Sequence, residues 1–144
     1  MKTILVFFSA LFFLNTACSD DGGDDISRAT NCDLFVEISE SKYENEQSMH
    51  GNIDNVSVQG DCLIVEYGAS GCDGSTWQPM LIDAGVIMES FPPQRNVRFV
   101  LKNEEACLAY FQEITSFDIT ALRVDGTNEV VLHIKDYSSV NYQY

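Results

Sequence analysis

The chain has 144 residues, of which 22 are Asp or Glu and 8 are Lys or Arg, so its formal net charge is −14. Binding to nucleic acid or adsorption to anionic lipid requires clustered basic residues, because these displace counterions from phosphates or meet the lipid head groups. No such cluster occurs, so we expect no nucleic-acid partner. A chain of this length predicts one hydrophobic core.

The chain begins with an apolar leader. Lys2 precedes an apolar run from Ile4 to Leu14, and two small residues stand directly before Cys18. This run fits the core of a signal peptide, because a helix that spans a bilayer needs about 20 apolar residues. We therefore predict a lipoprotein signal peptide over residues 1–17 and cleavage before Cys18.

Cys18 is the predicted lipidation site. It resembles the cysteine of a lipobox, whose thiol becomes diacylglyceryl-modified before cleavage, and two or more acyl chains anchor a protein firmly. Asn15 stands where an aliphatic residue is usual, which leaves ordinary secretion with a free Cys18 as the alternative. Residues 18–30 include an acidic, Gly-containing stretch that cannot bury apolar surface, so we expect a flexible tether there.

The acidic stretch after Cys18 resembles the segment that follows the lipidated cysteine in Bacteroidota lipoproteins on the outer face of the outer membrane. This resemblance implies that the protein is anchored to the outer membrane and exposed at the cell surface. It implies a location rather than an activity.

Residues 31–144 form the predicted domain, and they contain four cysteines. An exported chain meets an oxidising compartment, so an even set of cysteines predicts disulfides. Three connectivities are open, and we favour the one whose two bridges join cysteines that are neighbours along the chain. These bridges are Cys32 with Cys62 and Cys72 with Cys107.

Alternating apolar and polar residues dominate the second half of the chain, and this period of two predicts half-buried strands. The clearest inward sets are Leu63, Val65 and Tyr67, then Val97, Phe99 and Leu101, then Val130, Leu132 and Ile134. The predicted strands lie near residues 56–58, 63–67, 77–82, 97–101, 110–119, 130–134 and 140–144.

About seven strands with one apolar face each predict an all-β fold, an antiparallel two-sheet sandwich stabilised by disulfides. A small closed β-barrel is the alternative. The polar segment from Glu37 to Asn55 has no period and predicts a long surface loop. Asn103, an N-cap type of residue, predicts one helical turn beginning at Glu104.

Two strings between the predicted strands stand out. The stretch from Gly68 to Ser75 is rich in glycine but lacks the Lys and the following apolar helix of a phosphate-binding loop, so we expect a tight turn held by Cys72. Pro92 and Pro93 forbid helix and central strand, and they predict a rigid crossover between the sheets.

These strings also carry a resemblance over roughly residues 55–135. Short flavobacterial-type surface lipoproteins of Bacteroidota have a similar order of Ser70-Gly71-Cys72, a Pro-Pro segment at Pro92, a further cysteine at Cys107, and a strand that begins Phe117-Asp118. That family has no assigned activity. The resemblance supports the sandwich and its disulfides and implies no chemistry.

Candidate ligand-binding residues are Trp77 and Tyr67, because sugar rings stack on exposed aromatic side chains. Aromatic residues in strands are more often core residues, so burial of Trp77 would exclude this hypothesis. A zinc site is disfavoured because there is no C-x-x-C and the two histidines, His50 and His133, lie far apart. We predict no metal and no cofactor.

Neither histidine stands in a motif that ties it to a nucleophile, so we predict no catalytic residues and no enzyme. The predicted function is a lipid-anchored, extracytoplasmic, non-catalytic binding or structural accessory of the envelope, whose partner is an envelope protein or a glycan. The alternatives are a small secreted hydrolase that uses a carboxylate pair, and a carbohydrate-binding lipoprotein.

Overall fold

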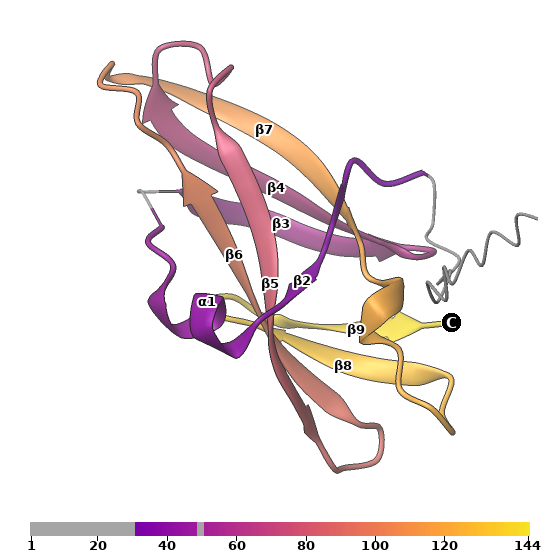
Figure 1. Cartoon of the computed structure of the whole chain (residues 1–144). Coiled ribbons are helices and arrows are strands. Elements are labelled where there is room, and N and C mark those ends of the chain that lie inside the picture. Colours follow the sequence, from indigo (N-terminus) through magenta and orange to yellow (C-terminus); the bar gives the residue numbers. More distant parts are fainter. Residues whose placement is uncertain (1–30, 49–50) are drawn as a thin grey trace, which may run out of the picture.

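The structure is a computed structural model that describes residues 31–48 and 51–144. The predicted leader, the predicted lipidation site Cys18, the predicted tether and His50 lie outside the described residues. The described part is mostly β, with two sheets that pack face to face (Figure 1).

The first sheet has four strands in the order β1-β7-β4-β3. Its strands are β1 (Leu34–Phe35), β3 (Asn52–Gln59), β4 (Cys62–Gly71) and β7 (Ala109–Asp118). The second sheet has five strands in the order β2-β5-β6-β8-β9. Its strands are β2 (Glu37–Ile38), β5 (Gln78–Met88), β6 (Gln94–Lys102), β8 (Glu129–Ile134) and β9 (Ser139–Gln143).

The predicted two-sheet β-sandwich is confirmed, and the described strands form no closed barrel. Both sheets are mixed rather than purely antiparallel as predicted, because β1 pairs with β7, β2 with β5, and β6 with β8 in parallel. The first two parallel pairs arise from one segment that crosses the edge of the sandwich. In that segment the N–H of Val36 donates to Asp118 in the first sheet, and that of Ser39 donates to Asp83 in the second.

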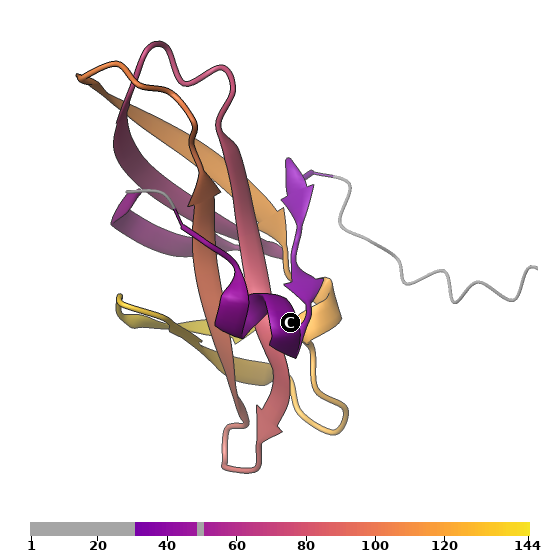
Figure 2. The same ribbon diagram turned by 60° about the vertical axis from the view of Figure 1, so that its left-hand side comes forward.

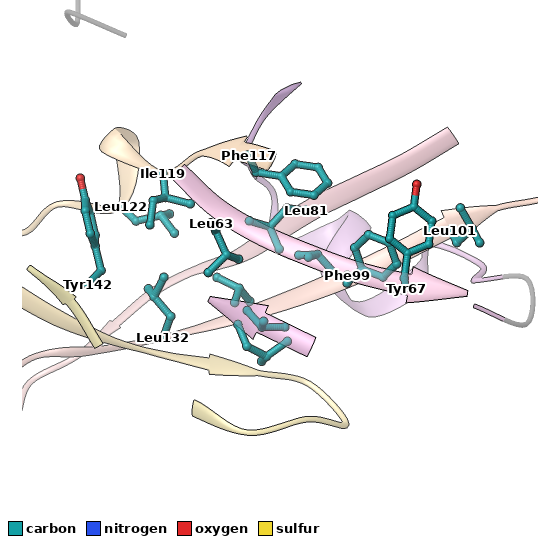
Figure 3. Packing of buried hydrophobic residues seen from close by; sticks show 14 of the residues in the cluster. Leu63, Tyr67, Leu81, Phe99, Leu101, Phe117, Ile119, Leu122, Leu132 and Tyr142 are labelled. Atoms are coloured by element: carbon teal, nitrogen blue, oxygen red, sulfur yellow. The ribbon is translucent and has the colours of Figure 1, made fainter. Parts of the chain in front are cut away.

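The three alternating sets predicted from the sequence all point into the core, which lies between the sheets (Figure 3). Leu63, Val97 and Leu132 are fully buried. Each strand therefore buries one face, as period two requires. Such burial is the main stabilising contribution in a domain of this size.

The segment from Glu37 to Asn55 is not the loop that we predicted, because it contains β2, the helix α1 (Glu40–Asn45) and the start of β3. The hydroxyl of Ser39 accepts a hydrogen bond from the backbone N–H of Lys42 at 3.3 Å and caps the helix. A helix of six residues is too short to show an apolar period.

The predicted helical turn after Asn103 is absent, and this correction has a local cause. The side-chain oxygen of Asn103 accepts from the N–H of Glu105 at 2.9 Å, and its amide donates to the carbonyl of Ser70 at 2.8 Å. These bonds fasten an irregular loop to the end of β4. The one-turn 3₁₀ helix in the described residues lies elsewhere, at Thr120–Leu122.

The prolines Pro92 and Pro93 do not cross between sheets, so that prediction is also wrong. β5 and β6 are antiparallel neighbours in one sheet, and their pairing continues to Met88 opposite Gln94. The prolines therefore lie in a short hairpin connection, where the hydroxyl of Ser90 donates to the carbonyl of Pro92 at 2.6 Å.

Candidate functional site

Trp77 and Tyr67 do not form a binding surface, because both side chains lie in the core. Their exposed fractions are 8% and 3%. The Tyr67 ring lies 4.8 Å from that of Phe99 and 6.2 Å from that of Trp77, between centroids. Tyr67 points inward because it continues the alternation of β4 (Figure 3). The prediction of an exposed aromatic platform for sugars is therefore wrong.

Two disulfides link strand ends of the first sheet. Cys32, before β1, is bonded to Cys62 at the start of β4, and Cys72 in the β4–β5 loop is bonded to Cys107 in the β6–β7 loop. This is the connectivity that the sequence favoured. The second bridge links the ends of two neighbouring strands of the first sheet, because Cys72 directly follows β4, Cys107 lies just before β7, and Gly71 pairs with Ala109.

The predicted turn from Gly68 to Ser75 is only partly right, because Gly68 to Gly71 are the end of β4. The rest of the glycine-rich stretch, from Cys72 to Ser75, lies between β4 and β5 and surrounds an anion supplied by the chain itself. The carboxylate of Glu105 accepts from the backbone N–H groups of Cys72 at 2.5 Å, and of Asp73 and Gly74 at 3.2 Å each. Its other oxygen accepts from the hydroxyl of Thr76 at 2.7 Å. The Thr76 hydroxyl, with the N–H groups of Cys72, Gly74 and Asp73, lowers the pKa of Glu105 to about 2.

Sequence reasoning missed Glu105. The signal was available in the predicted bridge, because pairing Cys72 with Cys107 brings residue 105 next to the glycine-rich turn. Successive N–H groups in such a turn form a concave site for anions. The stretch is thus built like an anion-binding loop, and Glu105 fills it.

A buried ion pair lies between β5 and β6. The guanidinium of Arg95 donates to both carboxylate oxygens of Asp83, at 3.0 and 2.7 Å, and both side chains are almost completely buried. The N–H of Gly85 also donates to Asp83, at 2.7 Å. The pairing register of β5 and β6 shifts just after Asp83, so this two-pronged contact holds the irregular stretch together.

His133, the histidine within the described residues, binds neutral partners. Its ring nitrogens lie 2.6 Å from the hydroxyl of Ser139 and 2.6 Å from the side-chain oxygen of Gln94. These three side chains come from three adjacent strands of the second sheet, β8, β9 and β6. The ring is thus held by a hydroxyl and an amide.

A hollow lies between the β5–β6 connection and the turn before β8. These two segments lie at the same end of the sandwich (Figure 1). Its volume is about 530 Å3. It is lined by Ile87, Glu89, Ser90, Phe91, Pro93, Val124, Asp125, Gly126 and Thr127. Phe91 is 95% exposed, and the carboxylates Glu89 and Asp125 come from the two facing loops. We call this the hairpin-end hollow.

Neither a metal site nor a membrane-spanning helix is found within residues 31–48 and 51–144. No three side chains of His, Cys, Asp or Glu in these ranges are grouped to hold a metal ion. No helix there has the length and apolar character to cross a bilayer.

Comparison with known proteins identifies the fold and no activity. No family model matches the sequence, and no curated protein matches it. One similar solved structure is a protein of unknown function, DUF1344, from Bacteroides vulgatus, with 11% identity over 77% of this chain and a TM-score of 0.50. Another, from Parabacteroides distasonis and described as toxin-related, has 12% identity over 77% of this chain and a TM-score of 0.51.

The chain spans 56% of the length of the first of these structures and 59% of the second. At such low identity the likeness extends to the fold alone.

Proposed function

We propose that this protein is a lipid-anchored, extracytoplasmic accessory of the bacterial envelope that binds a partner without catalysing a reaction. Cys18 would carry the anchor, and residues 18–30 would connect it to the sandwich. The two disulfides support an oxidising compartment, because cytosolic thiols are kept reduced.

The observation that carries the binding role is the hairpin-end hollow with its exposed aromatic side chain. Phe91 stands almost fully in solvent beside a concave surface, and Ile87 is 43% exposed next to it. Aromatic side chains beside a pocket are the usual anchors of a protein interface, because they bury a large area on contact. We propose an envelope protein as the partner.

The absence of catalysis in this proposal is supported by four carboxylates that make structural hydrogen bonds or ion pairs. Glu105 closes the glycine-rich loop, and Asp83 neutralises a buried arginine. Asp118 accepts from the hydroxyl of Thr120 at 2.6 Å, and Asp61 accepts from that of Tyr142 at 2.6 Å. These carboxylates hold loops and strand ends in place.

A photo-crosslinking amino acid tests the binding role in the intact lipoprotein in its own membrane. We place it at position 91 and, as a matched control, at position 108 in the β6–β7 loop, since Leu108 is also 92% exposed. The two loops lie at opposite ends of the sandwich (Figures 1 and 2). The proposal predicts a discrete crosslinked product from position 91 and none from position 108. Equal, diffuse products from both positions would contradict it.

A small hydrolase remains the second candidate, and one observation favours it. Glu89 and Asp125 both line the hairpin-end hollow, and paired carboxylates are the usual acid and base of glycoside hydrolysis. Turnover of aryl glycosides that is lost in both Glu89→Gln and Asp125→Asn would support this candidate. The same background rate in the wild type and both variants would exclude it for those substrates.

A further inference from the structure

The Lys and Arg side chains within the described residues of this acidic chain fall into two groups. Among residues 31–48 and 51–144, four basic side chains form ion pairs with carboxylates, with Lys42 on Glu37, Arg95 on Asp83, Lys102 on Glu46 and Arg123 on Asp61. The other two in these ranges are Arg98 and Lys135. Arg98 donates to the backbone carbonyl of Tyr43 at 2.8 Å, and the Lys135 ammonium lies 5.6 Å from the centre of the Tyr43 ring.

These two cations line the same hollow, which we call the β6–β8 hollow. Its volume is about 370 Å3, and it is separate from the hairpin-end hollow. It is lined by Ser48, Gly51, Asn52, Ile53, Arg98, Phe99, Lys135 and Asp136. The walls therefore combine two positive charges, one negative charge, a hydroxyl and an amide.

The sheet topology explains why a hollow forms here. β8 pairs with β6 only as far as Val97 opposite Ile134, and the N–H of Lys135 then donates to the carbonyl of Val97 at 2.8 Å. The chain next turns back into β9, whereas β6 continues to Lys102. Both views place the β8–β9 turn on the side where β3 begins (Figures 1 and 2).

Asp136 forms this turn with φ of 62°, a conformation that Asp and Asn adopt more readily than other non-glycine residues. The turn places Lys135 and Asp136 among the residues that line the β6–β8 hollow. Among the described residues that line the hollow, the ionised groups sum to one positive charge, in a chain whose net charge is −14.

We propose that the β6–β8 hollow binds the anionic group, a carboxylate or a phosphate, of a small ligand. The hydrogen bond to Tyr43 uses one nitrogen of the Arg98 guanidinium and leaves donors on the others, and the Lys135 ammonium makes no hydrogen bond or ion pair within the described residues. Hydrogen bonds between charged groups are the strong ones, so a guanidinium and an ammonium that line one hollow favour an oxyanion. Asn52 and Ser48 add neutral polar groups beside the anion.

Titration of the isotope-labelled full chain tests this proposal by NMR at constant ionic strength. One arm uses inorganic phosphate and the other uses glucuronate, so that the two sources of an oxyanion are distinguished, and neutral glucose is the control ligand. We expect saturable shifts of the backbone amides of Gly51, Asn52 and Asp136 with at least one anion, and none with glucose.

Three variants make the outcome specific. Lys135→Gln should weaken binding about tenfold, because one charge-assisted contact is lost. Asp136→Asn should strengthen binding, because it removes the repelling carboxylate and keeps a side chain that tolerates positive φ. Lys102→Gln removes the same charge from the same sheet, outside the hollow, and should leave the affinity unchanged.

The proposal is overturned if neither anion gives saturable shifts at these amides. It is also overturned if Lys102→Gln weakens binding as much as Lys135→Gln does, since general electrostatic attraction would then explain the shifts. Arg98→Lys is a supplementary variant that keeps the charge and removes the planar guanidinium. A loss of affinity with an unchanged amide spectrum would assign a direct contact to Arg98.

Discussion

The carboxylate of Glu105 accepts a hydrogen bond from the hydroxyl of Thr76, with 2.7 Å between the two oxygens, across the two loops that the Cys72–Cys107 disulfide joins. The bridge and the carboxylate thus close the same end of the sandwich, one covalently and the other through hydrogen bonds. The carboxylate of Glu105 thus holds the backbone of the β4–β5 loop in place.

Glu105→Gln should lower the free energy of unfolding at pH 7, because the charge that the backbone N–H groups surround is lost. The pKa of Glu105 is lowered from 4.5 to about 2, so its stabilising contribution is complete above pH 4.5 and is lost as the pH falls toward 2. Urea unfolding of both proteins should therefore give a difference that shrinks over this range. Glu104→Gln, at the exposed neighbouring position, is the control and should match the wild type. A difference that stays constant from pH 7 to pH 2 would contradict the account.

Arg95→Met should destabilise the fold by about 3–5 kcal/mol, because it leaves the buried Asp83 carboxylate without its counter-charge. Lys42→Met removes one partner of a half-exposed ion pair with Glu37, and it should cost less than about 1 kcal/mol. Chemical denaturation of both variants gives the comparison. Equal losses in the two variants would show that the buried pair has no special role.

Replacement of both Cys72 and Cys107 by serine should lower the free energy of unfolding by about 3–4 kcal/mol. The bridge closes a loop with a sequence separation of 35, and the chain-entropy model gives this magnitude for loops of that size. Peptide mapping without reductant should first recover Cys72 joined to Cys107 and Cys32 joined to Cys62. A map with other partners would contradict the structure.

Tyr142→Phe should destabilise the protein by about 1–2 kcal/mol, because the Tyr142 hydroxyl donates to Asp61 at 2.6 Å and accepts from Arg123 at 2.9 Å. The same hydroxyl is the first cause of the lowered pKa of Asp61, so that pKa should rise in the variant. NMR titration of the Asp61 carboxyl measures the rise. Tyr110→Phe, at an exposed position, is the control, and an unchanged Asp61 pKa in Tyr142→Phe would refute the assignment.

The core could be predicted from the sequence because period two directly reports which side of a strand is buried. Val97, Phe99 and Leu101 follow this rule along β6, and all three are buried. The parallel pairing of β1 and β2 could not be predicted in the same way. Each is only two residues long, and its partner strand lies far away in the sequence.

The polar contacts could not be predicted from the sequence for a related reason. The residues next to Asp83 and Arg95 in the sequence do not distinguish these two from solvent-exposed charges. Only the pairing of β5 with β6 brings the two side chains together. The burial of Trp77 could not be predicted either, because the side chain of a residue just before a strand can point into the core or into solvent. The packing of Tyr67 and Phe99 against the core determines that it points inward.

Metabolic labelling with palmitate tests the central claim, a disulfide-bonded sandwich held outside the cytoplasm by acyl chains on Cys18. Wild type and Cys18→Ala are expressed in the same cells, recovered with an antibody and compared for label. The account predicts label in the wild type and none in Cys18→Ala. A wild-type chain that carries no label and stays inside the cell with reduced cysteines would contradict it.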